Sequence, residues 1–459
     1  MLDCANLSQI VIFYQVIFAV LVRLGRLHKT QQLRCLKLFE YELMTDTTLN
    51  QSHKLTWRSF GPGILMASAA IGGSHLVAST QAGALYGWQL AIMIILANFF
   101  KYPFYRFGTE YAYSTGNSLV AGYAKISRVY LWAFFVLCII SGIISTGAVA
   151  LLCAVILGQI LPWELNTLAL SGIVMVTAWV LLFAGHYRFL DGLTKWIIAS
   201  LTVATVAAVF IAAGKPSAMA ADFMPASPWN LAALGFIVAL MGWMPAPLEF
   251  SAITSVWTSK KIRTDHTSRF QGFVDFNVGY FTSAILAVLF LALGVFVQYG
   301  TGTEIAMQGG AYVPQLINMY TETIGSWSKM LVAAIAFLCM YGTVITCADG
   351  YGRTNSESLS LILTNTTADT EKYVAKWTAF TIVAGYGLIA FFLGQMAALL
   401  KFAMISAFVT APIFAYLNYS LVKKEGHLST TMKWYALAGI VFLTGFTILF
   451  LLQFFGMIG

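Results

Sequence analysis

Two apolar stretches decide the fold: GPGILMASAAIGGSHLVAST at residues 61–80 and ALMGWMPAPLEFSAITSVW at residues 239–257. Each is long enough to cross a bilayer, which takes about 20 residues of helix. Each also carries glycine or proline in its middle, where a continuous helix would resist them. Pro245 and Pro247 remove two backbone donors, so nearby carbonyl groups lose their partners. We therefore predict that both stretches are broken membrane helices.

The composition of the whole chain is that of a membrane protein. Of its 459 residues, 59% are hydrophobic and only 10% are charged, whereas soluble domains carry about 25% charged residues. The apolar stretches are roughly 20 residues long and do not alternate in polarity, so they predict helices and not a β-barrel. The net charge of +8 is scattered between these stretches, which argues against nucleic acid as a partner. We expect an all-α polytopic protein in a lipid bilayer.

Hydropathy over windows of roughly 19 residues predicts about eleven transmembrane helices. The broken stretches become the first and the sixth span. Interrupted segments at matching places in two five-helix halves indicate a 5+5 inverted-repeat transporter whose site lies between the half-helices. The predicted spans are 59–83, 88–108, 131–160, 166–185, 191–213, 230–257, 271–299, 326–350, 374–394, 396–421 and 434–457.

This layout gives the chain a domain organisation. An N-terminal cytoplasmic segment at 1–58 precedes a first five-helix repeat at 59–213, a second repeat at 230–421, and an eleventh helix with the C-terminus at 434–459. Within the first segment, Met44 begins a polar stretch that leads directly into the first span.

Residues 1–43 can therefore be understood in two ways. Their apolar part, 8–22, is too short for a span and lacks the basic start of a signal peptide. It forms a surface helix, or residues 1–43 are no part of the natural protein, and the sequence leaves both interpretations open.

Basic residues predict the orientation of the chain. Lysine and arginine gather in alternate connections, as at Lys260, Lys261, Arg263 and Arg269, while the other side has little beyond Lys215 and Lys329. Basic loops lie in the cytoplasm. We expect the N-terminus inside the cytoplasmic (inner) membrane and, with an odd number of spans, the C-terminus outside.

The cysteines do not form a metal-binding pattern. None of the six makes a CxxC or similar spacing, and four lie inside apolar segments. Because free cysteine is often buried, we interpret them as packing residues. We expect no cofactor. The cysteines are Cys4, Cys35, Cys138, Cys153, Cys339 and Cys347.

Several motifs resemble the NRAMP family of divalent-metal transporters, within the larger superfamily of sodium-coupled amino-acid carriers. They are GPGILMASAAI, TQAGALYGWQLAIMIILANFF, HYRFLDGLTKWI and the Met-Pro pair of the sixth span, and they occur in this order. The resemblance covers nearly the whole chain from about residue 55. It implies a secondary transporter for manganese or iron.

The sequence departs from this family at its metal site. The family's first span carries Asp-Pro-Gly-Asn, whose Asp and Asn bind the metal, and here residues 72–75 read GGSH. Two acidic residues that serve proton transfer in the family's third span correspond to Gly147 and Ala150. In the sixth span, Ala246 replaces the family's histidine. The family's proton route is therefore absent from these positions.

A softer ligand set can replace the missing carboxylate. The resemblance aligns Met244 with the family's metal-binding methionine and Met241 with its carbonyl ligand. His75 adds an imidazole in the unwound part of the first span, beside the small Gly72, and this set suits manganese, iron or a later transition metal. Glu249, five residues beyond Met244, is the nearest negative charge. It lies near the metal or on a water-filled inner vestibule.

The sequence also leaves two other kinds of cargo open. A magnesium ion that keeps its water would be held through that water by Ser74, His75 and Glu249. A small organic solute would place a carboxylate on the N–H groups after Gly72–Gly73, with Trp243 stacking on its body.

Three further groups lie within the predicted spans. Lys101 either reaches the cytoplasmic interface, which we expect, or supplies a fixed positive charge in place of a coupling cation. Asp275 belongs to a gate or to a proton path. The hydroxyls of Thr343 and Thr346 are expected to bond to their own helix.

These observations predict a secondary-active transporter that imports a divalent metal by alternating access. Its site would comprise Gly72, His75, Met241 and Met244. The chain carries no HExxH helix or other cluster of intramembrane acids and histidines, which argues against a membrane-embedded enzyme. We expect a small ion or molecule as its partner, and a monomer is the simplest state.

Overall fold

The structure is a computed structural model that describes residues 55–458, apart from 163, 185–186, 217–218, 221, 307–308 and 427. Both interpretations of residues 1–43 fall outside this range. The chain divides into two units, Met1–Ser59 and Phe60–Gly459. In the first unit, the described residues include a short helix, η1 (Trp57–Ser59). Everything below concerns the second unit.

Helices make up the second unit, and no strand occurs among its described residues. The first half contains α3 (Pro62–Ala70), η2 (Ser74–Ser79), α4 (Thr80–Tyr86), η3 (Gly87–Leu90), α5 (Ala91–Thr115), α6 (Leu119–Ile126), α7 (Arg128–Gly158), α8 (Thr167–Phe183) and α9 (Tyr187–Ala213). The second half contains α10 (Leu231–Gly242), α11 (Phe250–Asp265), α12 (Arg269–Val297), α13 (Gly309–Ile324), η4 (Ser326–Ser328), α14 (Lys329–Thr364), α15 (Thr370–Phe391), α16 (Met396–Lys424) and α17 (Thr430–Phe454).

The predicted spans are confirmed. Eight helical segments among the described residues are long and apolar enough to cross a membrane. They correspond to the second, third, fifth and seventh to eleventh spans. The fourth span is α8, which is apolar but has only 17 residues. The first and sixth spans do not form single helices of the required length, because each is divided in two.

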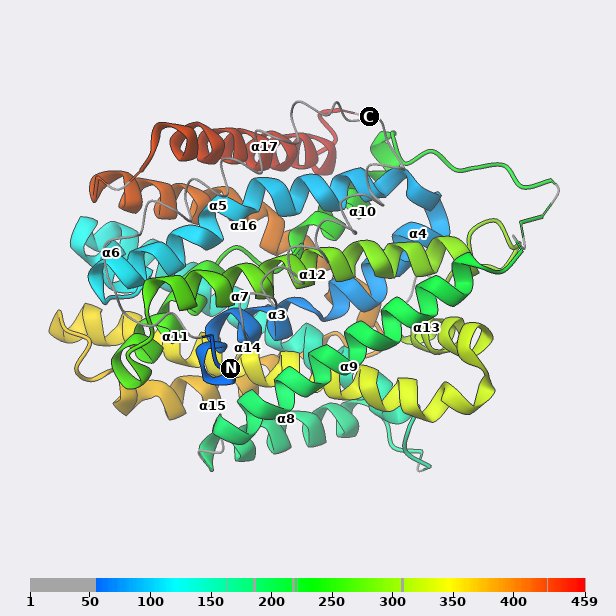
Figure 1. Cartoon of the computed structure of the whole chain (residues 1–459), viewed down its shortest axis with the longest axis horizontal. Helices are drawn as coiled ribbons and strands as arrows, with labels where there is room; N and C mark the ends of the chain where they lie inside the picture. Colours follow the sequence, from blue (N-terminus) through cyan, green and yellow to red (C-terminus); the bar gives the residue numbers. More distant parts are fainter. Residues whose placement is uncertain are drawn as a thin grey trace. The chain divides into compact units, whose positions relative to one another are not determined.

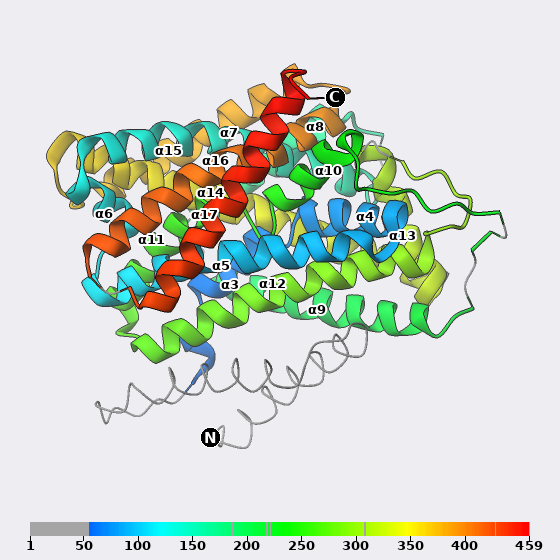
Figure 2. The same cartoon turned by 90° about the horizontal axis from the view of Figure 1, so that it is seen from above.

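The two halves of the chain repeat the same order of elements. The broken pair α3–α4 corresponds to α10–α11, and α5, α7, α8 and α9 correspond to α12, α14, α15 and α16. The packing repeats as well: α7, α8, α14 and α15 contact one another, and α3, α5, α11 and α12 form a second group (Figure 1). The eleventh span, α17, packs along α16 and α5 (Figure 2).

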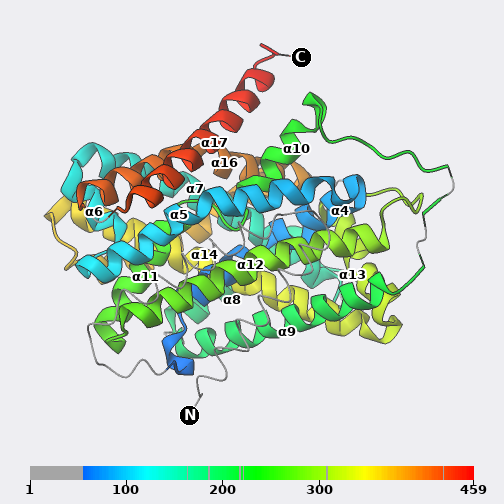
Figure 3. The same ribbon diagram turned by 45° about the horizontal axis from the view of Figure 1, so that its top comes forward.

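Helix α12 packs closely against both parts of the first span (Figure 3). A Cβ atom on Gly279 would come within 2.0 Å of the Gly63 carbonyl oxygen in α3. In the same way, a Cβ on Gly294 would lie 2.1 Å from the Thr80 carbonyl oxygen in α4. Glycine therefore lets the backbones of these helices touch, as is common where membrane helices pack.

Three features of the fold lie outside the predicted spans. Helix α6 is too short to cross a bilayer, and its N-cap, Ser118, accepts a hydrogen bond from the Ala121 N–H. Helix α13 does not appear among the apolar helices. Helix α14 continues to Thr364, fourteen residues past the predicted end at 350, because its polar last third packs against α6, α11 and α15.

Candidate functional site

Both predicted breaks are present, at the same places as the glycine and proline residues. Helix α3 ends at Ala70, and the Gly72 carbonyl accepts the N–H groups of His75 and Leu76 at 3.1 and 3.0 Å, where η2 begins. Helix α10 ends at Gly242 and α11 begins at Phe250, so residues 243–249 are not helical. The backbone is thus interrupted twice inside the membrane.

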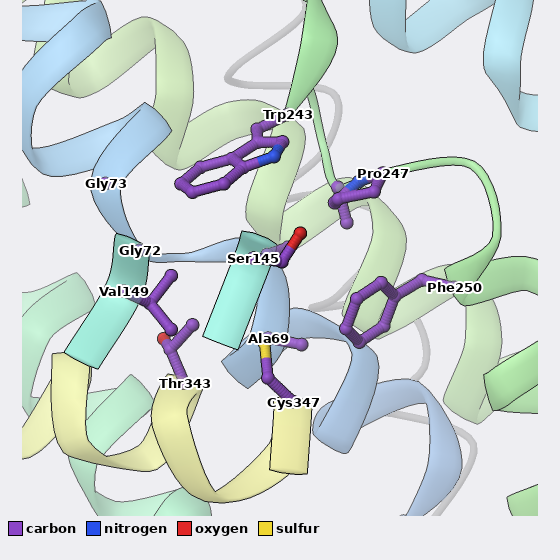
Figure 4. Close-up of a pocket in the computed structure, with 12 residues that line it drawn as sticks. Ala69, Gly72, Gly73, Ser145, Val149, Trp243, Pro247, Phe250, Thr343 and Cys347 are labelled. Carbon is purple, nitrogen blue, oxygen red and sulfur yellow. The ribbon is translucent and has the colours of Figure 1, made fainter. Parts of the chain in front are cut away.

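A small cavity lies between the two breaks (Figure 4). The Trp243 indole lies on one side of it, and Thr343 of α14 lies on the other. Helix α7 contributes Ser145 and Val149. The rest of the lining is small or apolar, apart from the Cys347 thiol.

Three of the predicted site residues, Gly72, Gly73 and Trp243, line this cavity. The absence of a side chain at Gly72 and Gly73 explains why the cavity is open. A Cβ on Gly72 would lie 3.2 Å from the Thr343 methyl group, and one on Gly73 would lie 3.3 Å from the Trp243 ring. Any larger side chain at either position would project into the space between them.

The structure does not bring His75 or Ser74 to the cavity wall. The His75 ring is fully buried and directed at α12, where Nε2 donates to the Ser283 carbonyl at 2.9 Å. Its Nδ1 then accepts from the Ser74 hydroxyl at 2.9 Å. Both ring nitrogens are therefore occupied in this conformation, and the metal-ligand role of His75 stays a prediction.

Met241 and Met244 are fully buried beside the second break, and neither lines the cavity. The carbonyl of Met241, the predicted ligand, already has a cationic partner. The Lys101 ammonium of α5 donates to it at 2.8 Å and to the Gly242 carbonyl at 2.8 Å. Lys101 is 0% exposed, so the expectation that it reaches the cytoplasmic interface is wrong. Carbonyls at the break hold it inside the protein, and that of Met241 also accepts the Met244 N–H at 3.2 Å.

Glu249 is also 0% exposed, which excludes the water-filled vestibule in this conformation. Its Oε1 accepts from the Tyr351 hydroxyl of α14 at 3.0 Å. Its Oε2 has no hydrogen-bond partner within the described part of the chain. The carboxylate lies at the start of α11, where the positive end of the helix dipole favours a negative charge.

Hydrogen-bonding groups at the cavity are few. The Trp243 Nε1 is buried and has no partner among the described residues. The Thr343 hydroxyl donates to the Ser68 carbonyl of α3 at 2.8 Å, and also approaches the Cys339 carbonyl of its own helix at 3.2 Å. Thr343 therefore links α14 to the first span, whereas Thr346 bonds to its own helix as expected, to the Gly342 carbonyl at 2.8 Å.

The residues that line the cavity include no acid. No group of three histidines, cysteines or acids that could hold a metal occurs among the described residues. Asp275 of α12 accepts the N–H groups of Gly61 and Gly63 at 3.0 and 2.7 Å, so it caps the start of α3. In the third span, Gly147 packs against α15, where its Cβ would lie 3.0 Å from the Gly385 carbonyl oxygen.

Sequence reasoning missed the walls that α7 and α14 provide, through Ser145, Val149 and Cys347. These residues lie in continuous apolar helices, so no local signal distinguishes them from packing residues. It also missed the carbonyl partners of Lys101, which lie about 140 residues away in the chain. A lysine inside an apolar span was the available signal.

Comparisons with known proteins agree with this fold. The family model described as "Natural resistance-associated macrophage protein-like" (Nramp) matches residues 63–453. An uncharacterised protein of Pasteurella multocida (strain Pm70) is 52% identical over 418 residues, which cover 89% of this chain and 96% of that protein.

Two solved structures extend the comparison. A variant of the Eremococcus coleocola manganese transporter is similar with a TM-score of 0.63 at 13% identity, over 88% of each chain. A nucleobase-cation-symport-1 family transporter, in a closed conformation with bromovinylhydantoin bound, has a TM-score of 0.56 at 14% identity, over 86% of this chain and 94% of that one.

Proposed function

Because the chain belongs to the Nramp family, whose members are metal-ion transporters, we propose that it imports a divalent metal cation by alternating access. The observation that carries this proposal is the cavity between the two broken spans. In inverted-repeat carriers the cargo binds between half-helices near the middle of the membrane, and the two groups of helices open it to each side in turn.

The cation chemistry differs from a site built on carboxylates. A divalent ion stripped of water needs oxygen, nitrogen or sulfur ligands and nearby negative charge. The cavity offers the hydroxyls of Ser145 and Thr343 and no carboxylate among its lining residues. We propose that the ion keeps part of its water there, and that His75, Met241 and Met244 become ligands only when the segments around the breaks rearrange. Manganese or iron is the cargo class that the family and the manganese-transporter neighbours support.

Uptake into proteoliposomes tests this proposal. The parent should accumulate Mn²⁺ or Fe²⁺, and His75→Ala and Met244→Ala should each lower the initial rate by about tenfold or more, which corresponds to about 1.4 kcal/mol. Met319→Ala is a matched control, because Met319 is a buried methionine in α13, outside the breaks. Manganese uptake that is present in the parent and unaffected by both substitutions would refute the proposed ligand set.

One observation favours a second candidate, a small organic solute. The buried Trp243 N–H has no partner among the described residues, and the rings of Trp243 and Phe250 both line the cavity. An N–H donor cannot bind a bare cation, but it can donate to an oxygen of an organic molecule, whose body would pack on the aromatic rings. Including amino acids and magnesium in the uptake panel separates the cargoes. Uptake of an amino acid without any divalent metal would establish this second candidate.

A further inference from the structure

The Lys101 ammonium occupies a cluster of backbone carbonyl groups at the second break. Its Nζ donates to the carbonyls of Met241 and Gly242 at 2.8 Å each, and to that of Ala246 at 3.4 Å. An ammonium group has three N–H donors, so the cluster supplies one acceptor for each. Lys101 is fully buried, and α5 brings it to this position by packing against α10 and α11.

The same carbonyls have the chemistry of a cation site. Two of them, of Met241 and Gly242, belong to the last turn of α10, where the helix dipole is negative. The third, the carbonyl of Ala246, lies in the non-helical segment, where Pro245 and Pro247 flank Ala246. Unwound carbonyls and half-helix C-termini are the groups that coordinate cations in broken-helix transporters. A bound cation and the ammonium therefore need the same oxygen atoms.

The ammonium already brings a positive charge to this region. Lys101 and Glu249, at the start of α11, are both fully buried, and each favours the charged form of the other. The Glu249 Oε2 has no hydrogen-bond partner among the described residues. A divalent ion bound beside the ammonium would add two positive charges to the one already present in a water-poor region, which is costly. The ion therefore gains most where it displaces the ammonium.

We propose that Lys101 is a tethered cation that competes with the cargo cation for the carbonyl oxygens of Met241, Gly242 and Ala246. This role rests on the proposed transport of a divalent metal. In the empty protein the ammonium satisfies the carbonyls. A cargo cation binds there by displacing it, so part of the binding free energy of the metal is used to move Lys101. The residue sets the affinity for the metal without being a ligand.

Calorimetric titration of the purified full chain with Mn²⁺ tests the competition. Lys101→Met removes the ammonium and keeps an apolar chain of similar length, so Mn²⁺ should bind about tenfold more tightly or better than to the parent. Lys101→Gln should show the same gain, because its amide still donates to a carbonyl but carries no charge. Lys101→Arg should bind like the parent. Thermal unfolding of each variant reports whether it is folded.

Lys195→Met is the matched control. Lys195 is also buried, and its ammonium donates to the Phe60 carbonyl at 2.9 Å, next to the start of α3 instead of at the second break. Its replacement should leave the Mn²⁺ affinity unchanged. An equal gain in Lys195→Met would show that any lost positive charge tightens binding, and would overturn the specific role of Lys101.

The result also separates this inference from the transport proposal. If Lys101→Met and Lys101→Gln are folded and bind Mn²⁺ no more tightly than the parent, while the parent transports Mn²⁺, the competition is wrong and the transport function stands. If the parent transports no divalent metal but both variants gain Mn²⁺ binding, the competition is supported and metal transport is wrong.

Discussion

At the scale of single residues, the two glycines of the first break determine the width of the cavity. Gly72 faces Thr343, and Gly73 faces the Trp243 ring, each at a distance where a Cβ would already be tight. The family's metal-binding carboxylate would occupy this segment, so its replacement by glycine removes both a charge and a side chain. Under the proposed function, cargo would then meet the walls provided by α7 and α14.

Filling the cavity should slow transport. Gly72→Val would place a Cβ 3.2 Å from the Thr343 methyl group and two further methyl groups beside it, so we expect the initial rate of metal uptake to fall by about tenfold or more. Because such overpacking also destabilises a protein by about 1–3 kcal/mol, the Tm should fall, and uptake is compared per amount of folded protein. Gly387→Val is the control, since no atom lies within 4 Å of a Cβ at Gly387. Unchanged uptake in Gly72→Val would show that cargo does not pass this cavity.

Some residues could be predicted from the sequence and others could not. Pro245 and Pro247 act on their own backbone, so the second break follows from local rules. Gly72, Gly73 and Trp243 line the cavity as the position of the breaks suggests. The carbonyl partners of His75 and Lys101 lie 208 and 140 residues away, so only the packed helices determine them. For Lys101, the acceptors exist only because another span is broken.

At the scale of elements, α12 holds the first span together. It contacts α3 on one side of the first break, where Gly279 meets Gly63, and α4 on the other, where Gly294 meets Thr80. Asp275 adds hydrogen bonds to the start of α3. Hydropathy identified α12 as a span, but it contains no information about which helix it would contact.

A methyl group in this contact should destabilise the protein. Gly279→Ala would put a Cβ within 2.0 Å of the Gly63 carbonyl oxygen, so the helices must move apart, at a cost of about 1–3 kcal/mol. Thermal unfolding in detergent should show a lower Tm than the parent. Gly445→Ala in α17 is the control, because its Cβ would meet nothing within 4 Å. A Tm equal to that of the control would mean that α12 and α3 do not pack as described.

At the scale of the whole molecule, the number of spans and the distribution of basic residues predict the orientation of the chain. The spans are confirmed, while the side on which each loop lies stays a prediction. Lysine and arginine gather at the end of α11 and the start of α12, at Lys260, Lys261, Arg263 and Arg269, and basic segments at the ends of membrane helices remain in the cytoplasm. The connection between α12 and α13 should then lie outside.

Cysteine labelling tests this orientation in intact cells. His266→Cys, between α11 and α12, should react with a membrane-impermeant maleimide only after permeabilisation, whereas Thr303→Cys should react directly. Both positions are exposed. The free cysteines within the described residues are buried, and Cys4 and Cys35 are replaced by serine in the background. The opposite labelling pattern would invert the predicted topology.

The contact of α12 with both α3 and α4 also limits how the protein can move. Backbones in contact at Gly63–Gly279 and at Thr80–Gly294 leave no room for one half of the first span to slide past α12 without the other. These three helices should therefore move as one rigid body. The conformational change that admits cargo from each side would then require bending of the helices that flank this rigid body, among which α9 contacts both α12 and α14.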